Sequence, residues 1–326
     1  MKKIIALLLI ISCLAFVFTA CGDNDGDDNG NNTPQLVKIN IGVMNGPTGM
    51  GMAKLINDNG MDSAKYAFTT FSSPQDATAG LQNGELDMLC VPTNLAANLA
   101  NKASGFVTVA AINCLGSLYV VTRDGVEIND ISDLQNKTIY YGEATSTTGP
   151  ILNYILSEND ITANLVVEDT MDILSAKIVN GTVDIAVLPE PKATAAILSA
   201  KQNSNNYSIS LNLSTEWSEV SDTPLTMGCI IVRNEFLAEN KASVDAFLAE
   251  YKASIEYVGS AENKDAAAQM IVDAGILPKL PVAKSALSNL YGSIVYIDGE
   301  SMKNALKGFY SAINMTSPAD AFYYEK

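Results

Sequence analysis

The 326-residue sequence contains no histidine, only two arginines and a single tryptophan. Histidine is the commonest metal ligand, and the five cysteines include no Cys-x-x-Cys pair, so a zinc site is not expected. No cofactor is expected. Arg123 and Arg233 are the only guanidinium groups, and the chain has no basic stripe. With a net charge of −16, this composition argues against a nucleic-acid partner, because phosphates are bound through cationic contacts.

The first 20 residues have the pattern of a secretory signal peptide. Lys2 and Lys3 precede an apolar run, residues 4–18, that is too short for a good membrane span. Thr19-Ala20-Cys21 resembles a bacterial lipoprotein lipobox, which implies lipidation of Cys21 and a membrane anchor. Ordinary cleavage near Ala20 is the alternative. Cleavage before Cys21 would change the net charge to −18, and residues 21–35, mostly Asp, Asn and Gly, predict a flexible acidic linker.

Three cysteines remain beyond the lipobox, and each lies in an apolar run: Cys90, Cys114 and Cys229. This placement predicts small buried side chains. A Cys114–Cys229 disulfide is the alternative if the two strands are neighbours.

The rest of the chain repeats itself at an offset of 97 residues. Eight residues recur without a gap: Thr48, Leu55, Ala79, Asn83, Gly84, Asp87, Pro92 and Ala96 match Thr145, Leu152, Ala176, Asn180, Gly181, Asp184, Pro189 and Ala193. In each copy an apolar run ends in a small-residue turn, and a helix follows. Such a turn presents backbone N–H groups that can hold a polar or anionic group. Two such turns predict two lobes that close on one ligand.

Strands that alternate with helices predict an α/β fold with a mixed, mainly parallel sheet in each lobe, flanked by helices. Residues 211–223 are polar and are expected to be irregular, and residues after 242 are expected to be mostly helical. The most economical layout gives lobe one residues 36–117 and 225–326. Lobe two, residues 118–224, is inserted between these parts and joined to them by a two-strand hinge.

Several stretches resemble a known family: residues 118–124, residues 131–139, residues 180–191 and the C-terminal ending ADAFYYEK, residues 319–326. Together they resemble type II periplasmic-binding proteins, and more narrowly the solute-binding components of nitrate/sulfonate/taurine and thiamine-pyrimidine ABC importers. The resemblance implies a monomeric, extracytoplasmic capture protein with a small-molecule ligand and a membrane permease as partner. It also implies a binding protein without catalytic residues.

Ligands of open α/β sheets bind beyond the carboxyl ends of the strands, so the turns named above are the candidate site. The candidate residues are Asn45, Gly46, Pro47, Thr48, Gly49, Thr93, Asn94, Ser117, Thr145, Ser146, Thr147 and Glu190. Thr48 and Thr145 are expected at equivalent points of the two copies. For residues 145–147 the alternative is simple helix capping, and for Glu190 it is a solvated charge at the rim.

No arginine lies in these turns. An anion would therefore be held by dipoles and hydroxyls, and a neutral polar molecule fits equally well. Two other functions remain open. One is a sensor of the same fold that reports to a membrane receptor. The other is an enzyme resembling those of menaquinone synthesis, with Glu190 as its base, although acid–base catalysis usually recruits histidine or paired carboxylates.

Overall fold

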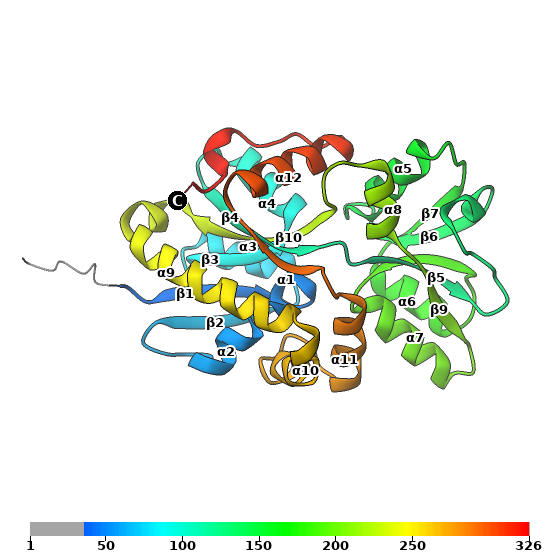
Figure 1. Ribbon diagram of the computed structural model, residues 1–326, viewed down its shortest axis with the longest axis horizontal. Helices are drawn as coiled ribbons and strands as arrows, with labels where there is room; N and C mark the ends of the chain where they lie inside the picture. Colours follow the sequence, from blue (N-terminus) through cyan, green and yellow to red (C-terminus); the bar gives the residue numbers. More distant parts are fainter. Residues whose placement is uncertain (1–35, 326) are drawn as a thin grey trace, which may run out of the picture. The chain divides into compact units, whose positions relative to one another are not determined.

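The computed structural model describes residues 36–325, so the signal peptide, the linker and Cys21 lie outside the described residues. The chain from Leu36 onward forms one compact unit that contains two sheets. We call lobe one the six-stranded sheet with its helices and lobe two the five-stranded sheet with its helices. Figure 1 shows the two sheets with helices on both faces.

Lobe one has the strand order β11-β4-β10-β3-β1-β2. β1 pairs in parallel with β2 and β3, whereas β10 joins β3 and β4 antiparallel and β11 joins β4 antiparallel. Its strands are β1 (Ile39–Met44), β2 (Tyr66–Phe71), β3 (Met88–Pro92), β4 (Val107–Leu115), β10 (Thr226–Arg233) and β11 (Ile294–Ile297). Its helices are α1 (Pro47–Met50), α2 (Ala53–Asn59), α3 (Pro74–Gln82), α4 (Thr93–Lys102), α9 (Asn234–Gly259), η2 (Ala261–Asn263), α10 (Lys264–Asp273), α11 (Leu280–Asn289), α12 (Gly299–Ala312) and η3 (Asp320–Phe322).

Lobe two has the order β7-β6-β8-β5-β9, with β6 parallel to β7 and β8 and with β5 antiparallel to β8 and β9. Its strands are β5 (Leu118–Arg123), β6 (Thr138–Gly142), β7 (Asn164–Glu168), β8 (Ile185–Pro189) and β9 (Tyr207–Asn212). Its helices are η1 (Ile131–Leu134), α5 (Thr148–Glu158), α6 (Met171–Val179), α7 (Lys192–Gln202) and α8 (Leu213–Val220).

The repeat found in the sequence corresponds to a repeat of secondary-structure elements in the two lobes. α3 and α6, and likewise β3 and β8, begin and end 97 residues apart. The caps correspond as well: the Ser73 hydroxyl accepts the Asp76 N–H, and the Thr170 hydroxyl accepts the Ile173 N–H. The two copies therefore share their local helix signals as well as their apolar pattern.

These caps give a matched prediction of stability. Ser73→Ala and Thr170→Ala should each lower the free energy of unfolding by about 1 kcal/mol, because each leaves a helix N–H without its acceptor. Thr147 is also an N-cap residue, but its side chain makes no capping hydrogen bond, so Thr147→Ala is the control and should change stability little. Urea titration followed by circular dichroism measures all three. An equal loss in the control would contradict the capping argument.

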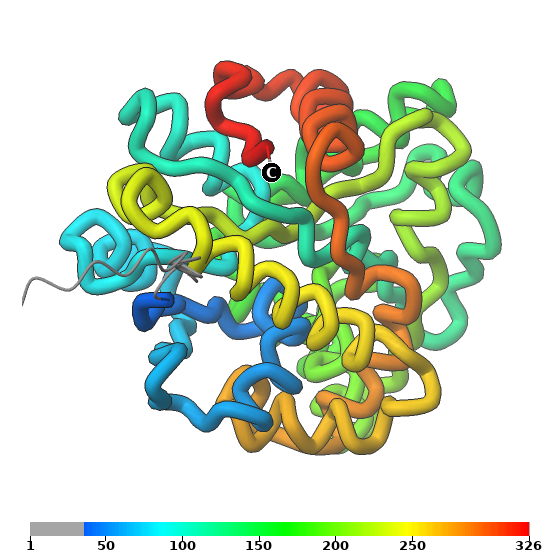
Figure 2. The backbone as a smooth tube through the Cα atoms, turned by 60° about the vertical axis from the view of Figure 1, so that its left-hand side comes forward, coloured from blue at the N-terminus to red at the C-terminus, as the bar shows by residue number. Residues whose placement is uncertain are grey.

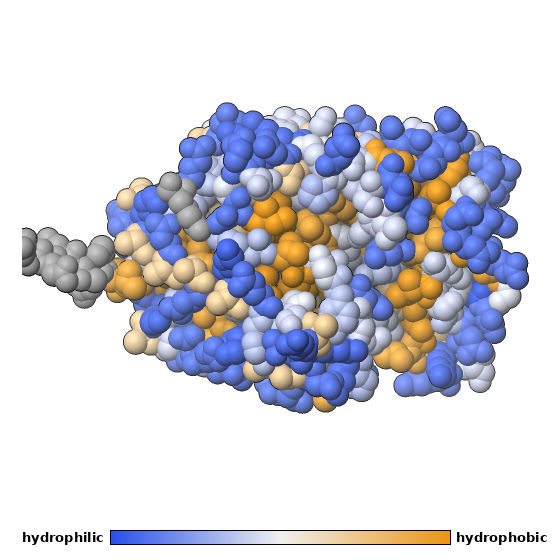
Figure 3. Space-filling model, in the orientation of Figure 1, coloured by the Kyte–Doolittle hydropathy of each residue, from blue (hydrophilic) through white to orange (hydrophobic). Residues whose placement is uncertain are grey.

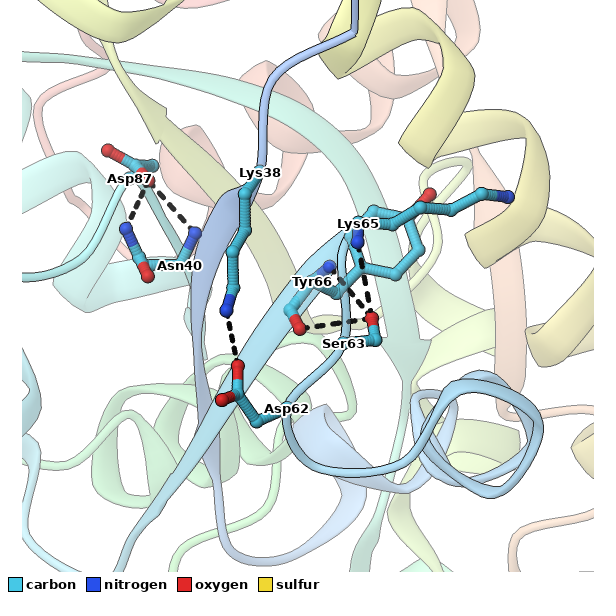
Figure 4. Close-up of polar contacts among 7 residues, drawn as sticks. All are labelled: Lys38, Asn40, Asp62, Ser63, Lys65, Tyr66 and Asp87. Carbon is cyan, nitrogen blue, oxygen red and sulfur yellow. Dashed lines mark hydrogen bonds and ion pairs between the residues drawn. The ribbon is translucent and has the colours of Figure 1, made fainter.

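In each sheet the repeated aspartate binds the arginine at the end of the antiparallel neighbouring strand, which is β10 in lobe one and β5 in lobe two. Arg233 of β10 donates its backbone N–H to the carbonyl of Asp87, and its guanidinium pairs with the Asp87 carboxylate at 3.3 Å. In lobe two, Arg123 of β5 bonds Asp184 in the same two ways, with an ion-pair distance of 2.6 Å. Figure 4 shows that Asp87 also accepts the backbone and amide N–H groups of Asn40, at 2.9 and 3.0 Å. Both arginines of the chain thus lie at the strand ends opposite the predicted site.

The chain passes between the lobes at two adjacent segments. Gly116 and Ser117 connect β4 to β5, and the Gly116 N–H donates to the carbonyl of Leu225, at 2.7 Å, just ahead of β10. Gly116 has a φ of +62°, and a Cβ there would lie 1.9 Å from the Ser214 hydroxyl, so only glycine fits. The two-strand hinge predicted from the sequence is present.

The central strands are buried along nearly their whole length, and since successive side chains point to opposite faces, a core forms on each face of both sheets. On one face the core is continuous between the lobes: side chains of α3, α4 and α12 from lobe one and of α5 and α8 from lobe two belong to the same cluster. On the other face the cores are separate, with α2, α9, α10 and α11 in one cluster and α6 and α7 in another. The apolar link between the lobes is therefore one-sided.

The C-terminal half wraps lobe one. Figure 2 shows the long helix α9 running across the segment that contains α1 and α2. The final residues return to β4, where Tyr323 bridges Val109 in parallel and the Tyr324 N–H donates to the Val109 carbonyl at 2.9 Å. Phe322, Tyr323 and Tyr324 are all buried. The ending thus extends the cover that β11 provides along the outer edge of β4.

Some sequence-based expectations need correction. Residues 211–223 are not irregular: β9 ends within this stretch, and Asn212 caps α8, whose Trp217 is completely buried. The segment after residue 242 is mostly helical, as expected, and residues 294–297 add a short strand between α11 and α12. Cys114 and Cys229 lie on neighbouring strands, but both are free buried thiols, as is Cys90. Burial raises the pKa of Cys90 and Cys114 to about 12, so these thiols are neutral at physiological pH.

The surface of the described part is mixed. Figure 3 shows hydrophobic residues exposed in several separate areas among hydrophilic ones. The large exposed apolar side chains are Leu36, Val37, Met61, Val167, Ile173, Leu198 and Tyr291. Isolated exposed apolar residues are normal on soluble proteins. Within residues 36–325, no helix combines the length and the apolar character that crossing a membrane requires.

Candidate functional site

The first turn of lobe one lies opposite the second turn of lobe two. A Cβ built on Gly46 would be 3.8 Å from Cδ of Pro191, so the turns after β1 and β8 face each other. Asn45 is exposed and directs its amide to the Ser72 hydroxyl, at 2.9 Å. Gly46 is therefore at the boundary between the lobes, whereas the side chain of Asn45 is engaged with lobe one.

Thr48 is held in place from the sheet behind it. Its carbonyl accepts one amide hydrogen of Asn113 at 3.0 Å, and Asn113 also donates to the Tyr251 hydroxyl at 3.1 Å. A Cβ on Gly49 would lie 2.2 Å from the Met44 carbonyl oxygen, so glycine permits the short helix α1, which begins at Pro47, to pack against β1. The Asn113 amide oxygen is buried without a partner. Asn113 was not among the candidate residues, although a lone amide in an apolar strand was a usable signal.

The second turn of lobe one is tied to the start of β10. The Thr93 hydroxyl donates to the Thr226 carbonyl at 3.0 Å, and the Thr93 carbonyl accepts the Tyr310 hydroxyl at 2.9 Å. Thr226 is completely buried, and its own hydroxyl has no partner. Asn94 is half-buried. The fold thus brings hydroxyl and amide groups together where β1, β3, β4 and β10 meet the hinge.

The first turn of lobe two differs from the expectation. Thr145 is exposed in a turn ahead of α5, whereas Thr48 is buried inside α1, so the two threonines are not equivalent. Ser146 donates its hydroxyl to the Gly142 carbonyl at 3.1 Å and thereby closes the turn. Thr147 is the N-cap residue of α5. The offset of 97 fails here because the turn before α5 is longer than the turn before α1.

Thr148-Gly149 is the structural counterpart of Thr48-Gly49. Thr148 is 2% exposed at the first turn of α5, and a Cβ on Gly149 would lie 2.9 Å from the Tyr141 ring, just as one on Gly49 would meet β1. Thr148 is therefore a better candidate than Thr145 for the lobe-two side of the site. The shared Thr-Gly pair was readable in the sequence once an offset of 100 residues was allowed.

Glu190 is a buried side chain and not a solvated charge at the rim. It is 1% exposed, and its carboxylate accepts the Thr194 hydroxyl at 2.8 Å and the Asn289 amide at 2.5 Å. Burial raises the pKa of Glu190, while the hydrogen bonds from Asn289 and Thr194 act in the opposite direction. Its backbone N–H donates to the carbonyl of Ser117 at 2.8 Å. Glu190 thus connects the hinge to both lobes.

Ser117 occupies a strained position in the hinge. Its φ is +79°, in the left-handed region that non-glycine residues rarely adopt, and the residue is 2% exposed. Residues held in this conformation concentrate at functional sites, because the surrounding structure must enforce it. The position supports the choice of Ser117 as a candidate without assigning it a ligand contact.

The strand ends that face the other lobe therefore carry neutral hydrogen-bonding groups and one buried carboxylate. Hydroxyls, amides and backbone N–H groups can orient a small polar molecule in such a place. Both arginines are engaged with aspartates at the opposite strand ends. Among residues 36–325, no group of three or more Cys, Asp or Glu side chains is placed to hold a metal ion.

Known proteins resemble this chain in sequence and in fold. A family model described as "Menaquinone biosynthesis" matches residues 52–314. No curated protein matches the chain. A crystal structure of an ABC transporter from Parabacteroides distasonis matches with a TM-score of 0.71 and 20% identity, covering 89% of this chain and 99% of the other.

Two further solved structures have the same fold at lower identity. The periplasmic aliphatic sulphonate-binding protein SsuA from Escherichia coli matches with a TM-score of 0.65 and 15% identity over 89% of this chain and 93% of its own. The periplasmic nitrate-binding protein NrtA from Synechocystis PCC 6803 gives 0.56 and 12% over 83% and 76%. The two-lobed periplasmic-binding-protein fold predicted from the sequence is confirmed.

Proposed function

The chain belongs to the menaquinone biosynthesis family. From the fold that it shares with solute-binding proteins, we propose that it captures a small polar or anionic molecule between its lobes and delivers it unchanged to an ABC importer permease. One observation carries the proposal: the turns of the two lobes face each other at Gly46 and Pro191 across a two-strand hinge. The solved ABC-transporter and solute-binding proteins that have the same fold support it.

The proposal includes the layout and the cellular place of the protein. Lobe one would comprise residues 36–117 and 225–326, and lobe two residues 118–224. Residues 1–20 would direct export, residues 21–35 would form a tether, and a lipid on Cys21 would anchor an otherwise monomeric protein outside the cytoplasm. The signal pattern in the sequence supports this part.

The candidate ligand residues are retained with one replacement. Asn45 to Gly49, Thr93, Asn94, Ser117, Ser146 and Thr147 remain candidates, and the buried Thr148 takes the place of the exposed Thr145 because it is the counterpart of Thr48. Glu190 contributes through the contact between the lobes, since its oxygens are engaged by Thr194 and Asn289.

An enzyme of menaquinone biosynthesis is the second candidate, and the family match is the observation that favours it. A general base must come within hydrogen-bond reach of the proton that it removes. Glu190 is the buried carboxylate at these strand ends, and opening of the contact with Asn289 would be needed to free it. The fate of a bound ligand separates the two functions.

The deciding experiment is a thermal-shift screen of the chain from Leu36 onward with sulfonates, nitrate, pyrimidines, amino acids, polyamines and chorismate-like acids. A ligand that binds only the folded state stabilises it by about 2.7 kcal/mol at a hundredfold excess over Kd. A ligand recovered intact by mass spectrometry supports the capture protein. A ligand recovered chemically altered establishes the enzyme instead.

Binding should depend on the buried threonines more than on the exposed one. Thr48→Ala and Thr148→Val should each weaken binding of a ligand from the screen about three- to tenfold, the effect of one lost hydrogen bond. Thr145→Ala, at the exposed position, is the matched control and should change the Kd little. Isothermal titration measures the three constants, and a loss for Thr145→Ala as large as that for Thr48→Ala would restore the equivalence expected from the sequence.

A further inference from the structure

The lobes are bridged by polar contacts on the face where their apolar cores are separate. Asn289 is the last residue of α11, whose Ala283, Ala286 and Leu287 are buried in the core of lobe one. Its amide donates to Glu190 at 2.5 Å and lies 3.3 Å from the Thr194 hydroxyl. One residue of lobe one thus contacts the start of α7 in lobe two.

A second element of lobe two, the strand β5, is hydrogen-bonded to the same residue. The Tyr119 hydroxyl of β5 donates to the backbone carbonyl of Asn289 at 2.5 Å. Tyr119 is 3% exposed and Glu190 is 1% exposed, whereas Asn289 itself is half-buried, so the contact is partly shielded from water. Burial is the main cause that raises the pKa of Tyr119, and the nearby charge of Glu190 adds to it, so the hydroxyl keeps its proton.

The opposite face is joined by a different kind of contact. Trp217 of α8 lies 5.8 Å from the Phe309 ring of α12, centroid to centroid, inside the core that is continuous between the lobes. Apolar contact is not directional and tolerates a change of angle, whereas hydrogen bonds weaken steeply when their geometry is lost. A rotation of the lobes would therefore preserve the Trp217 side and break the Asn289 side.

We infer that Asn289 is a latch between the lobes, whose contacts with Glu190 and Tyr119 must break before the strand ends open. The apolar contact of Trp217 with Phe309 acts as the fixed side of the rotation. The latch does not rest on the proposed function, because it concerns the equilibrium between two arrangements of the chain with or without a ligand. A hydrogen bond to a carboxylate is strong enough to shift such an equilibrium about ten- to hundredfold.

The test uses hydrogen–deuterium exchange of the full-length protein and two matched substitutions. Asn289→Asp keeps the size of the side chain, but it removes the donor and places a like charge beside Glu190. Peptides covering residues 189–196 and 286–292 should then exchange at least tenfold faster, whereas residues 213–220 and 302–312 should keep their protection. Asn263→Asp is the control, because Asn263 also ends a helical segment but donates to Tyr257 within lobe one.

Unchanged exchange at both latch peptides in Asn289→Asp would overturn the inference, and so would an equal increase in Asn263→Asp. If Asn289→Asp loses its folded circular dichroism spectrum, Tyr119→Phe provides the same readout, because it removes a single hydroxyl from the latch. Faster exchange of the same two peptides would then support the latch, and unchanged exchange would refute it.

Discussion

Asp87→Ala is expected to lower the free energy of unfolding by about 2–4 kcal/mol, because it removes a buried carboxylate that accepts hydrogen bonds from two residues and leaves the Arg233 guanidinium with only the exposed Glu235 as its ionic partner. The side chain of Asp87 is 8% exposed and that of Arg233 is 17% exposed. The substitution also removes the acceptor of both Asn40 N–H groups, which hold β1 beside β3. Urea unfolding followed by circular dichroism measures the loss.

The internal repeat supplies the control for this prediction. Asp184 makes the same pair with Arg123, but its side chain is 56% exposed. Exposed ion pairs contribute about 0–1 kcal/mol, so Asp184→Ala should cost no more than that. Equal losses in the two variants would show that the repeated aspartate acts through the local turn and not through burial of the pair.

Trp217→Ala should cost about 3–5 kcal/mol, the usual effect of truncating a large aromatic side chain in a core. Trp217 lies 4.8 Å from the Tyr154 ring and 5.8 Å from the Phe309 ring, and its indole N–H donates to the Thr223 carbonyl at 2.6 Å. Since the cavity would open in the core that both lobes share, both lobes should unfold in a single transition at lower urea concentration.

Circular dichroism must follow this variant, because the chain has no other tryptophan. Tyr291→Ala removes an aromatic side chain that is 42% exposed, and it should change stability by less than about 0.5 kcal/mol. Two separate transitions in Trp217→Ala would contradict the idea of one core shared by both lobes.

Much of the fold could be predicted from the sequence because the same helix caps and apolar strands recur in both copies of the repeat. The capped helices α3 and α6 and the strands β3 and β8 follow from the offset of 97 residues. α8 was not predicted because most of its residues are polar and only Leu213 and Trp217 are buried. The N-cap residue Asn212 and the apolar spacing of Leu213 and Trp217 could have indicated a helix.

The candidate site was less predictable, because its residues are defined by contacts between distant parts of the chain. Thr145 matched Thr48 in sequence, but extra residues in the turn before α5 moved the matching position to Thr148. Asn289 has no local signature at all, since it ends an ordinary helix and gains its role from Glu190, 99 positions away. The burial of Glu190 could not be foreseen for the same reason.

The position of β10 has a consequence for the order in which the protein can acquire its structure during synthesis. β10 lies between β3 and β4, and in the sheet of lobe one it is the strand that joins these two. A growing chain that ends before residue 226 therefore carries β1, β2 and β3 with the β3 edge still unpaired, and β4 with no place in that sheet. Unpaired strand edges invite association with other chains. Lobe two can complete its own sheet earlier, because its last strand, β9, ends at residue 212. The residues synthesised first therefore belong to the lobe that is completed last. Until residue 233 has emerged, the unpaired edges of β3 and β4 need protection from other chains.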